Sequence, residues 1–68
     1  MELRGVVYKL TGAGALVRGE DGGRYFLPRS EALGRWPRVG DTYLFDVMPT
    51  DRTPLAVGAR FLQSGTTV

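Results

Sequence analysis

Apolar residues along this chain gather in five short runs that are separated by segments rich in glycine and proline. The fourth run alternates most regularly, with Tyr43, Phe45 and Val47 on one face. Alternation with a period of two is typical of a strand with one buried side, and no stretch keeps the 3.6-residue period of a helix. The pattern therefore predicts an all-β chain whose five strands cover residues 3–10, 15–17, 24–29, 41–48 and 55–62.

The segments between these runs carry the residues that tight turns require. Asp21, Gly22 and Gly23 tolerate positive φ angles and predict a hairpin between the second and third strands. Residues 30–33 begin with a serine that caps one short helical turn, and a longer loop follows from 34 to 40. Because a short β protein must hide the edges of its sheet, we expect the strands to close. The predicted fold is a small five-stranded antiparallel barrel of the OB type.

A chain of 68 residues has room for one domain. We expect the barrel to occupy residues 1–62 and the small, polar residues 63–68 to form a flexible C-terminal tail. The expected core consists of apolar residues on the inner side of the strands and one in the helical turn. These are Val7, Leu16, Tyr25, Leu27, Leu33, Tyr43, Phe45, Val47, Val57 and Ala59.

The composition argues against catalysis and against a metal site. The sequence contains neither cysteine nor histidine, so it lacks thiolates, the commonest general base and the commonest metal ligands. The serine and threonine hydroxyls have no evident base partner, and Asp41, Asp46 and Asp51 follow no ligand spacing. We therefore predict a protein that is not an enzyme, with no cofactor, no metal and no small-molecule substrate.

The chain also lacks the usual targeting signals. Its first residues lead into no apolar signal segment, and no stretch approaches the roughly 18 apolar residues of a membrane span. We therefore expect a cytoplasmic protein without a membrane partner.

The charge balance is mildly basic, with nine Lys and Arg against seven Asp and Glu and a net charge of +2. Such a charge permits a nucleic-acid partner without requiring one. All the cations except Lys9 are arginines, whose planar guanidinium binds phosphate and stacks on rings. Charge alone therefore leaves the partner open.

Five segments in order resemble the cold-shock domain family over nearly the whole chain. Residues 4–8 are similar to its Gly-x-Val opening strand, and residues 12–16 to its first RNA-binding motif, Lys-Gly-Phe-Gly-Phe-Ile. Residues 25–30 resemble its second motif, Val-Phe-Val-His-Phe-Ser. Residues 39–47 resemble its Gly-Gln-x-Val-x-Phe-x-Val strand, and residues 54–57 its Gly-Pro-x-Ala element. The resemblance implies an OB barrel that binds single-stranded RNA or DNA through aromatics on its first three strands.

Most of the aromatics that the resemblance implies are exchanged in this sequence. Lys9 stands where the family has Trp, and Pro28 and Arg29 replace its His and the next Phe. Phe is also replaced at three further positions, which are Leu10, Ala13 and Ala15. Phe26 is kept, and Trp36 stands in for the aromatic of the long loop. Because each base–aromatic stack contributes about 1–3 kcal/mol, we expect weak binding that depends mainly on charge.

Two functions follow from these exchanges. The first is binding of single-stranded RNA or DNA, with stacking partly replaced by cations, and its candidate residues are Lys9, Arg18, Arg24, Phe26, Arg29, Trp36 and Arg60. The second is contact with a protein partner or a second copy of the chain. That contact would use an apolar patch formed by Leu10, Ala13, Ala15, Phe26, Pro28 and Leu44. The sequence leaves both functions open, and Trp36 either contacts a ligand or pins its loop onto the barrel.

Overall fold

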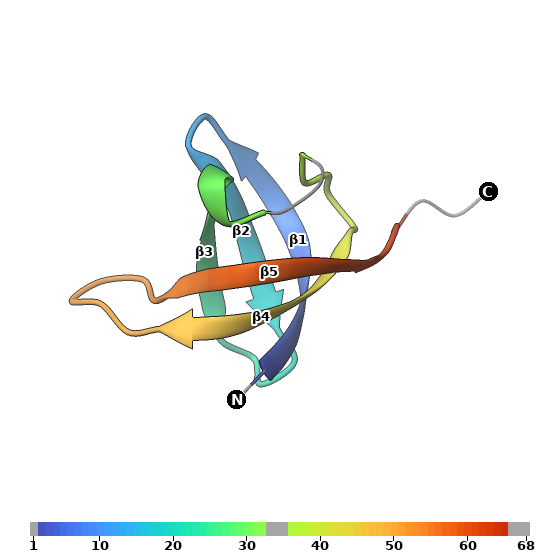
Figure 1. Cartoon of the computed structure of the whole chain (residues 1–68). Helices are drawn as coiled ribbons and strands as arrows, with labels where there is room; N and C mark the ends of the chain where they lie inside the picture. The colour runs from blue at the N-terminus through green and yellow to red at the C-terminus, as the bar shows by residue number, and fades with distance from the viewer. Residues whose placement is uncertain (1, 33–35, 66–68) are drawn as a thin grey trace.

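The computed structural model describes residues 2–32 and 36–65, and within them the chain forms five strands that close into a barrel. The neighbours around the barrel follow the order β1-β2-β3-β5-β4, with β4 returning to β1 (Figure 1). The elements are β1 (Glu2–Thr11), β2 (Gly14–Gly19), β3 (Arg24–Pro28), the 3-10 turn η1 (Arg29–Glu31), β4 (Thr42–Met48) and β5 (Leu55–Gln63). The predicted all-β, five-stranded barrel is therefore confirmed.

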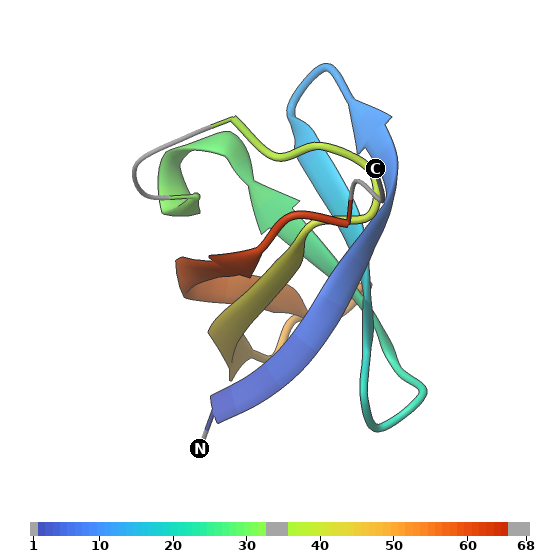
Figure 2. The same ribbon diagram turned by 90° about the vertical axis from the view of Figure 1, so that its right-hand side faces the viewer.

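The longest strand, β1, serves two neighbours. Its first residues pair with β4, and its later residues pair with β2, so that β1 joins the two halves of the barrel (Figure 2). A β-bulge lies between Val7 and Lys9, because Val7 pairs with Val17 and Lys9 with the next residue of β2, Leu16. Bulges bend a strand and increase its twist, which helps a strand of ten residues to curve around a small barrel.

One neighbouring pair corrects the prediction that the barrel is antiparallel. β3 and β5 run parallel and meet at Phe26 and Leu55, and a parallel bridge joins Ala32 to Ala59. The other four pairs are antiparallel. The reason is geometric, since strand directions cannot alternate all the way around a closed ring with an odd number of strands. The barrel is therefore mixed.

The inner positions of the strands form one core. The buried apolar residues are Val7, Ala15, Val17, Tyr25, Leu27, Tyr43, Phe45, Ala56 and Ala59. Val47 is partly buried and packs against this cluster. Gly5 is also buried, and a Cβ there would lie 2.6 Å from Val17 Cγ1 and 2.8 Å from Phe45 Cε2. The core therefore fills the barrel so closely that β1 has no room for a side chain at this position.

Two of the predicted core residues are wrong. On β2, Ala15 and Val17 point inward, so alternation turns Leu16 outward and leaves it half-buried. Val57 is also half-buried, because it pairs with the exposed Asp46 on the outer side of β4. Leu33 lies outside the described residues.

Candidate nucleic-acid interface

The outer sides of β1, β2 and β3 bring most of the predicted strand residues together. Residues paired across neighbouring strands point to the same side of a sheet. Lys9 pairs with Leu16, which pairs with Phe26, and the next outward row runs from Val6 through Arg18 to Arg24. We call this surface the β1–β3 face and define it as Val6, Tyr8, Lys9, Leu16, Arg18, Arg24 and Phe26.

The β1–β3 face combines an apolar centre with exposed cations. Leu16 and Phe26 are half-buried, whereas Lys9, Arg18 and Arg24 are exposed. No carboxylate belongs to the face as defined, and the nearest one along β2 is Glu20, just beyond the strand end. A depression of about 300 Å³ borders the face, and its lining includes Arg4, Val6 and Arg18 together with Glu20. The face therefore offers positive charge next to flat apolar surface.

Tyr8 belongs to this face although the sequence analysis did not select it. Val7 is buried, so alternation turns Tyr8 outward, and the bulge then keeps Lys9 on the same side. Tyr8 is 38% exposed, and the Arg18 guanidinium carbon lies 5.7 Å from the centroid of its ring. Val7 was predicted to point into the core, and strand alternation from Val7 could have placed Tyr8 on the outer face.

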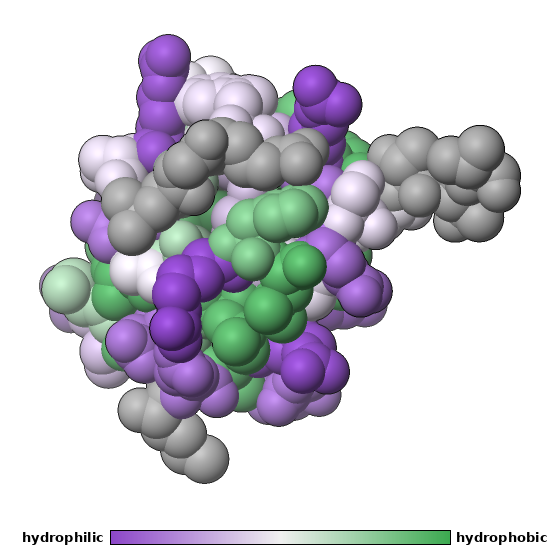
Figure 3. Space-filling view, turned by 45° about the vertical axis from the view of Figure 1, so that its right-hand side comes forward, coloured by the Kyte–Doolittle hydropathy of each residue, from purple (hydrophilic) through white to green (hydrophobic). Residues whose placement is uncertain are grey.

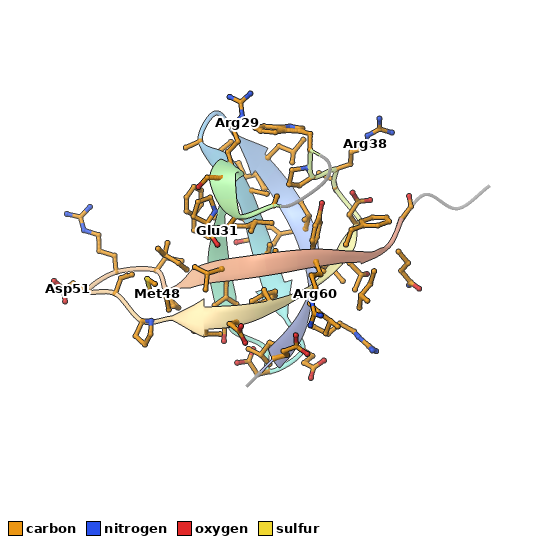
Figure 4. The ribbon with its side chains drawn as sticks, in the orientation of Figure 1. Arg29, Glu31, Arg38, Met48, Asp51 and Arg60 are labelled. Carbon is orange, nitrogen blue, oxygen red and sulfur yellow. The ribbon has the colours of Figure 1, made fainter. Side chains whose placement is uncertain are left out.

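Arg29 and Trp36 form a separate pair at one end of the barrel. The Arg29 guanidinium carbon lies 4.5 Å from the centroid of the Trp36 ring, and Trp36 as a residue is 42% exposed. The backbone N–H of Arg29 donates to the carbonyl of Ala13, which holds the pair beside the turn between β1 and β2 (Figure 4). Two predicted residues from different segments are thus in contact, beyond the end of the β1–β3 face.

Arg60 lies on a different wall of the barrel. It pairs with Leu44 on β4, and its guanidinium forms an ion pair with Glu2 (Figure 4). Since β4 separates β5 from β1, this ion pair crosses the outside of β4. The structure therefore does not bring Arg60 to the β1–β3 face.

The predicted apolar patch for a protein partner is not one continuous surface. Ala15 is 0% exposed and belongs to the core, so its place in the patch was wrong. Leu44 lies on β4, between Arg4 and Arg60 in the outward row. Leu62, on the neighbouring strand β5, is also exposed. Figure 3 shows hydrophobic residues bordered by hydrophilic ones on this side of the barrel.

Across residues 2–32 and 36–65, no group of three or more potential ligand side chains could hold a metal ion. The same residues include no helix that is long and apolar enough to cross a membrane. A wider depression of about 680 Å³ is lined by Leu3, Asp21, Tyr25, Asp46 and Val47. None of the predicted nucleic-acid-binding residues lines it.

Fold and surface together define a small closed β-barrel with a basic and partly aromatic outer face. Comparison with known proteins adds no family to this description. No protein-family model matches the chain, and no curated protein matches it.

Proposed function

We propose that this protein binds single-stranded RNA or DNA on the β1–β3 face, without catalysis and without a cofactor. One observation carries the proposal: Lys9, Arg18 and Arg24 lie on the same outer face as Phe26, on three neighbouring strands, and none of the residues that define this face is a carboxylate. The resemblance of the sequence to cold-shock domains supports the proposal. Such a function fits a protein of the cytoplasm.

Charge supplies most of the expected affinity. Lys and Arg side chains that neutralise phosphates release counterions, so such binding weakens steeply as salt rises. Bases of a single strand are free to stack, because they are not held in a duplex, and Phe26 offers a ring for this. With few aromatics available, we expect micromolar affinity at low salt, which corresponds to about 8 kcal/mol.

The Arg29–Trp36 pair extends this proposal beyond the strands. A guanidinium that already lies over an indole ring is a cation–π pair, and its outer surface combines charge with a flat ring. A nucleotide presents the matching chemistry, a phosphate and a base. We therefore include Arg29 and Trp36 in the proposed binding surface, whereas Arg60 is already paired with Glu2 on another wall.

The test is a titration of labelled single-stranded RNA and DNA of about ten nucleotides, followed by anisotropy at about 50 mM and about 200 mM salt. If three phosphates are contacted, the affinity should fall about 20-fold between these salt concentrations. Phe26→Ala should weaken binding by about fivefold or more, because it removes a stacking ring. Arg52→Ala, in the exposed turn between β4 and β5, is the control and should bind as the unaltered protein does. Absence of binding at the lower salt would reject the proposal.

A further inference from the structure

The backbone of β1 sets Tyr8 apart from the other tyrosines of the chain. The chain has three tyrosines, of which Tyr25 is 7% exposed and Tyr43 is 0% exposed. Tyr8 is 38% exposed and lies in the bulge, between Val7, which pairs with Val17, and Lys9, which pairs with Leu16. Tyr8 is not among the buried core residues, and its exposure lets a ligand reach it.

The neighbours of Tyr8 suit one class of ligand. Arg18 lies with its guanidinium carbon 5.7 Å from the ring centroid, within the range of a cation–π contact. The contact orients the ring at the surface and places a phosphate-binding group beside it. A flat ring next to a guanidinium matches a nucleotide, which joins a flat base to a phosphate.

The distance between Tyr8 and Phe26 decides whether the two rings could contact the same base or two different bases. Tyr8 is on β1 and Phe26 on β3, with β2 between them, so their strands are about 10 Å apart. Stacked bases are separated by only about 3.4 Å along a strand. The two rings are therefore too far apart to hold the same base, and they suit two different bases of one extended strand.

We infer that Tyr8 is a base-stacking residue of the β1–β3 face. This inference rests on the proposed function and adds a second ring to it, on β1. The site then holds one base at Tyr8 and another at Phe26, with the cations of the face between and beside them.

Nuclear magnetic resonance of protein with isotope-labelled tyrosine rings tests the inference directly. The three tyrosines give separate ring signals, and the two buried ones serve as internal controls. On addition of a single-stranded oligonucleotide of about ten bases, the Tyr8 ring signals should move upfield because of the ring current of a stacked base. The signals of Tyr25 and Tyr43 should stay in place.

Variants separate this inference from the proposed function. Tyr8→Ala should weaken oligonucleotide binding at least about fivefold, whereas Tyr8→Phe, which keeps the ring, should bind within about twofold of the unaltered protein. Arg52→Ala, in the exposed turn between β4 and β5, is again the control and should bind as the unaltered protein does. If Phe26→Ala weakens binding but Tyr8→Ala does not, and the Tyr8 signals stay in place, only the inference about Tyr8 is overturned. If the unaltered protein does not bind, both are rejected.

Discussion

At the scale of single residues, one carboxylate organises the turn between β2 and β3. Asp21 Oδ2 accepts a hydrogen bond from the Tyr25 hydroxyl at 2.5 Å, and Oδ1 accepts one from the backbone N–H of Gly23 at 2.9 Å. The bond from Tyr25 and then the bond from Gly23 lower the pKa of Asp21, because both favour its ionised form. The same bond to Asp21 raises the pKa of Tyr25.

These shifts predict how the stability of the protein depends on pH. A carboxyl whose pKa is lowered on folding stabilises the fold above its unfolded pKa, near 4, and this contribution is lost as pH falls through the folded pKa. Asp21→Asn should therefore lower the melting temperature at neutral pH. The difference from the unaltered protein should shrink at about pH 3, because Asp21 is then increasingly protonated.

Thermal denaturation followed by circular dichroism at the two pH values measures this effect. Asp51→Asn is the matched control, since it makes the same exchange in the exposed turn between β4 and β5. A melting-temperature difference for Asp21→Asn that is equal at both pH values would contradict the assignment.

At the scale of the elements, the parallel contact between β3 and β5 is the short seam of the barrel. The Phe26 N–H donates to the Pro54 carbonyl at 3.0 Å where the seam begins, and the bridge from Ala32 to Ala59 closes its far end. Gly58 has a φ of 58°, in the left-handed region that favours glycine. The N–H of Gly58 donates to Glu31 Oε1 at 2.7 Å, so a side chain from η1 links η1 to β5 beside the parallel contact (Figure 4).

Removal of this side-chain contact should weaken the barrel. Glu31→Ala should lower the free energy of unfolding by about 1 kcal/mol, because the Gly58 N–H loses a charged acceptor. Glu31→Gln keeps an oxygen acceptor and should restore most of the stability. Urea denaturation measures both values, with Glu20→Ala in an exposed turn as the control. Equal stability of Glu31→Ala and Glu20→Ala would show that the contact contributes nothing.

The elements were largely predictable, and their exceptions have local causes. The alternation of Tyr43 and Phe45 identified β4 and its buried side, because a period of two is visible in the residues themselves. On β2 the same method failed, since Ala15, Leu16 and Val17 are all apolar and no alternation distinguishes inside from outside. Pairing with β1 and β3 decides that Leu16 faces outward.

At the scale of the whole molecule, closure of the barrel places the charged side chains on different outer faces. Lys9, Arg18 and Arg24 share the β1–β3 face, whereas Arg60 meets Glu2 across β4. A net charge of +2 is thus distributed unevenly, and the β1–β3 face has a larger local excess of positive charge than the net value suggests. Such a face attracts phosphates more strongly than the same charges spread evenly.

The proposed face predicts a change in salt dependence. The double variant Lys9→Gln/Arg24→Gln should reduce the slope of log affinity against log salt by about 1.4, because each lost phosphate contact on a single strand accounts for about 0.7. Arg38→Gln/Arg52→Gln removes the same charge from exposed residues outside the face and should leave the slope nearly unchanged. Equal slopes for the two double variants would mean that net charge, and not this face, governs binding.

The number of strands and the buried sides of β3 and β4 can be predicted from the residues alone, and so can the lack of thiolate and imidazole groups, because the chain has no cysteine and no histidine. These properties depend on residue type and local alternation, which need no knowledge of distant contacts. Three arrangements become visible only in the folded barrel: Tyr8 and Lys9 share one side, Arg29 lies over Trp36, and Arg60 forms an ion pair with Glu2. These arrangements depend on a bulge, on strand pairing and on closure, each of which brings together residues that the linear order keeps apart.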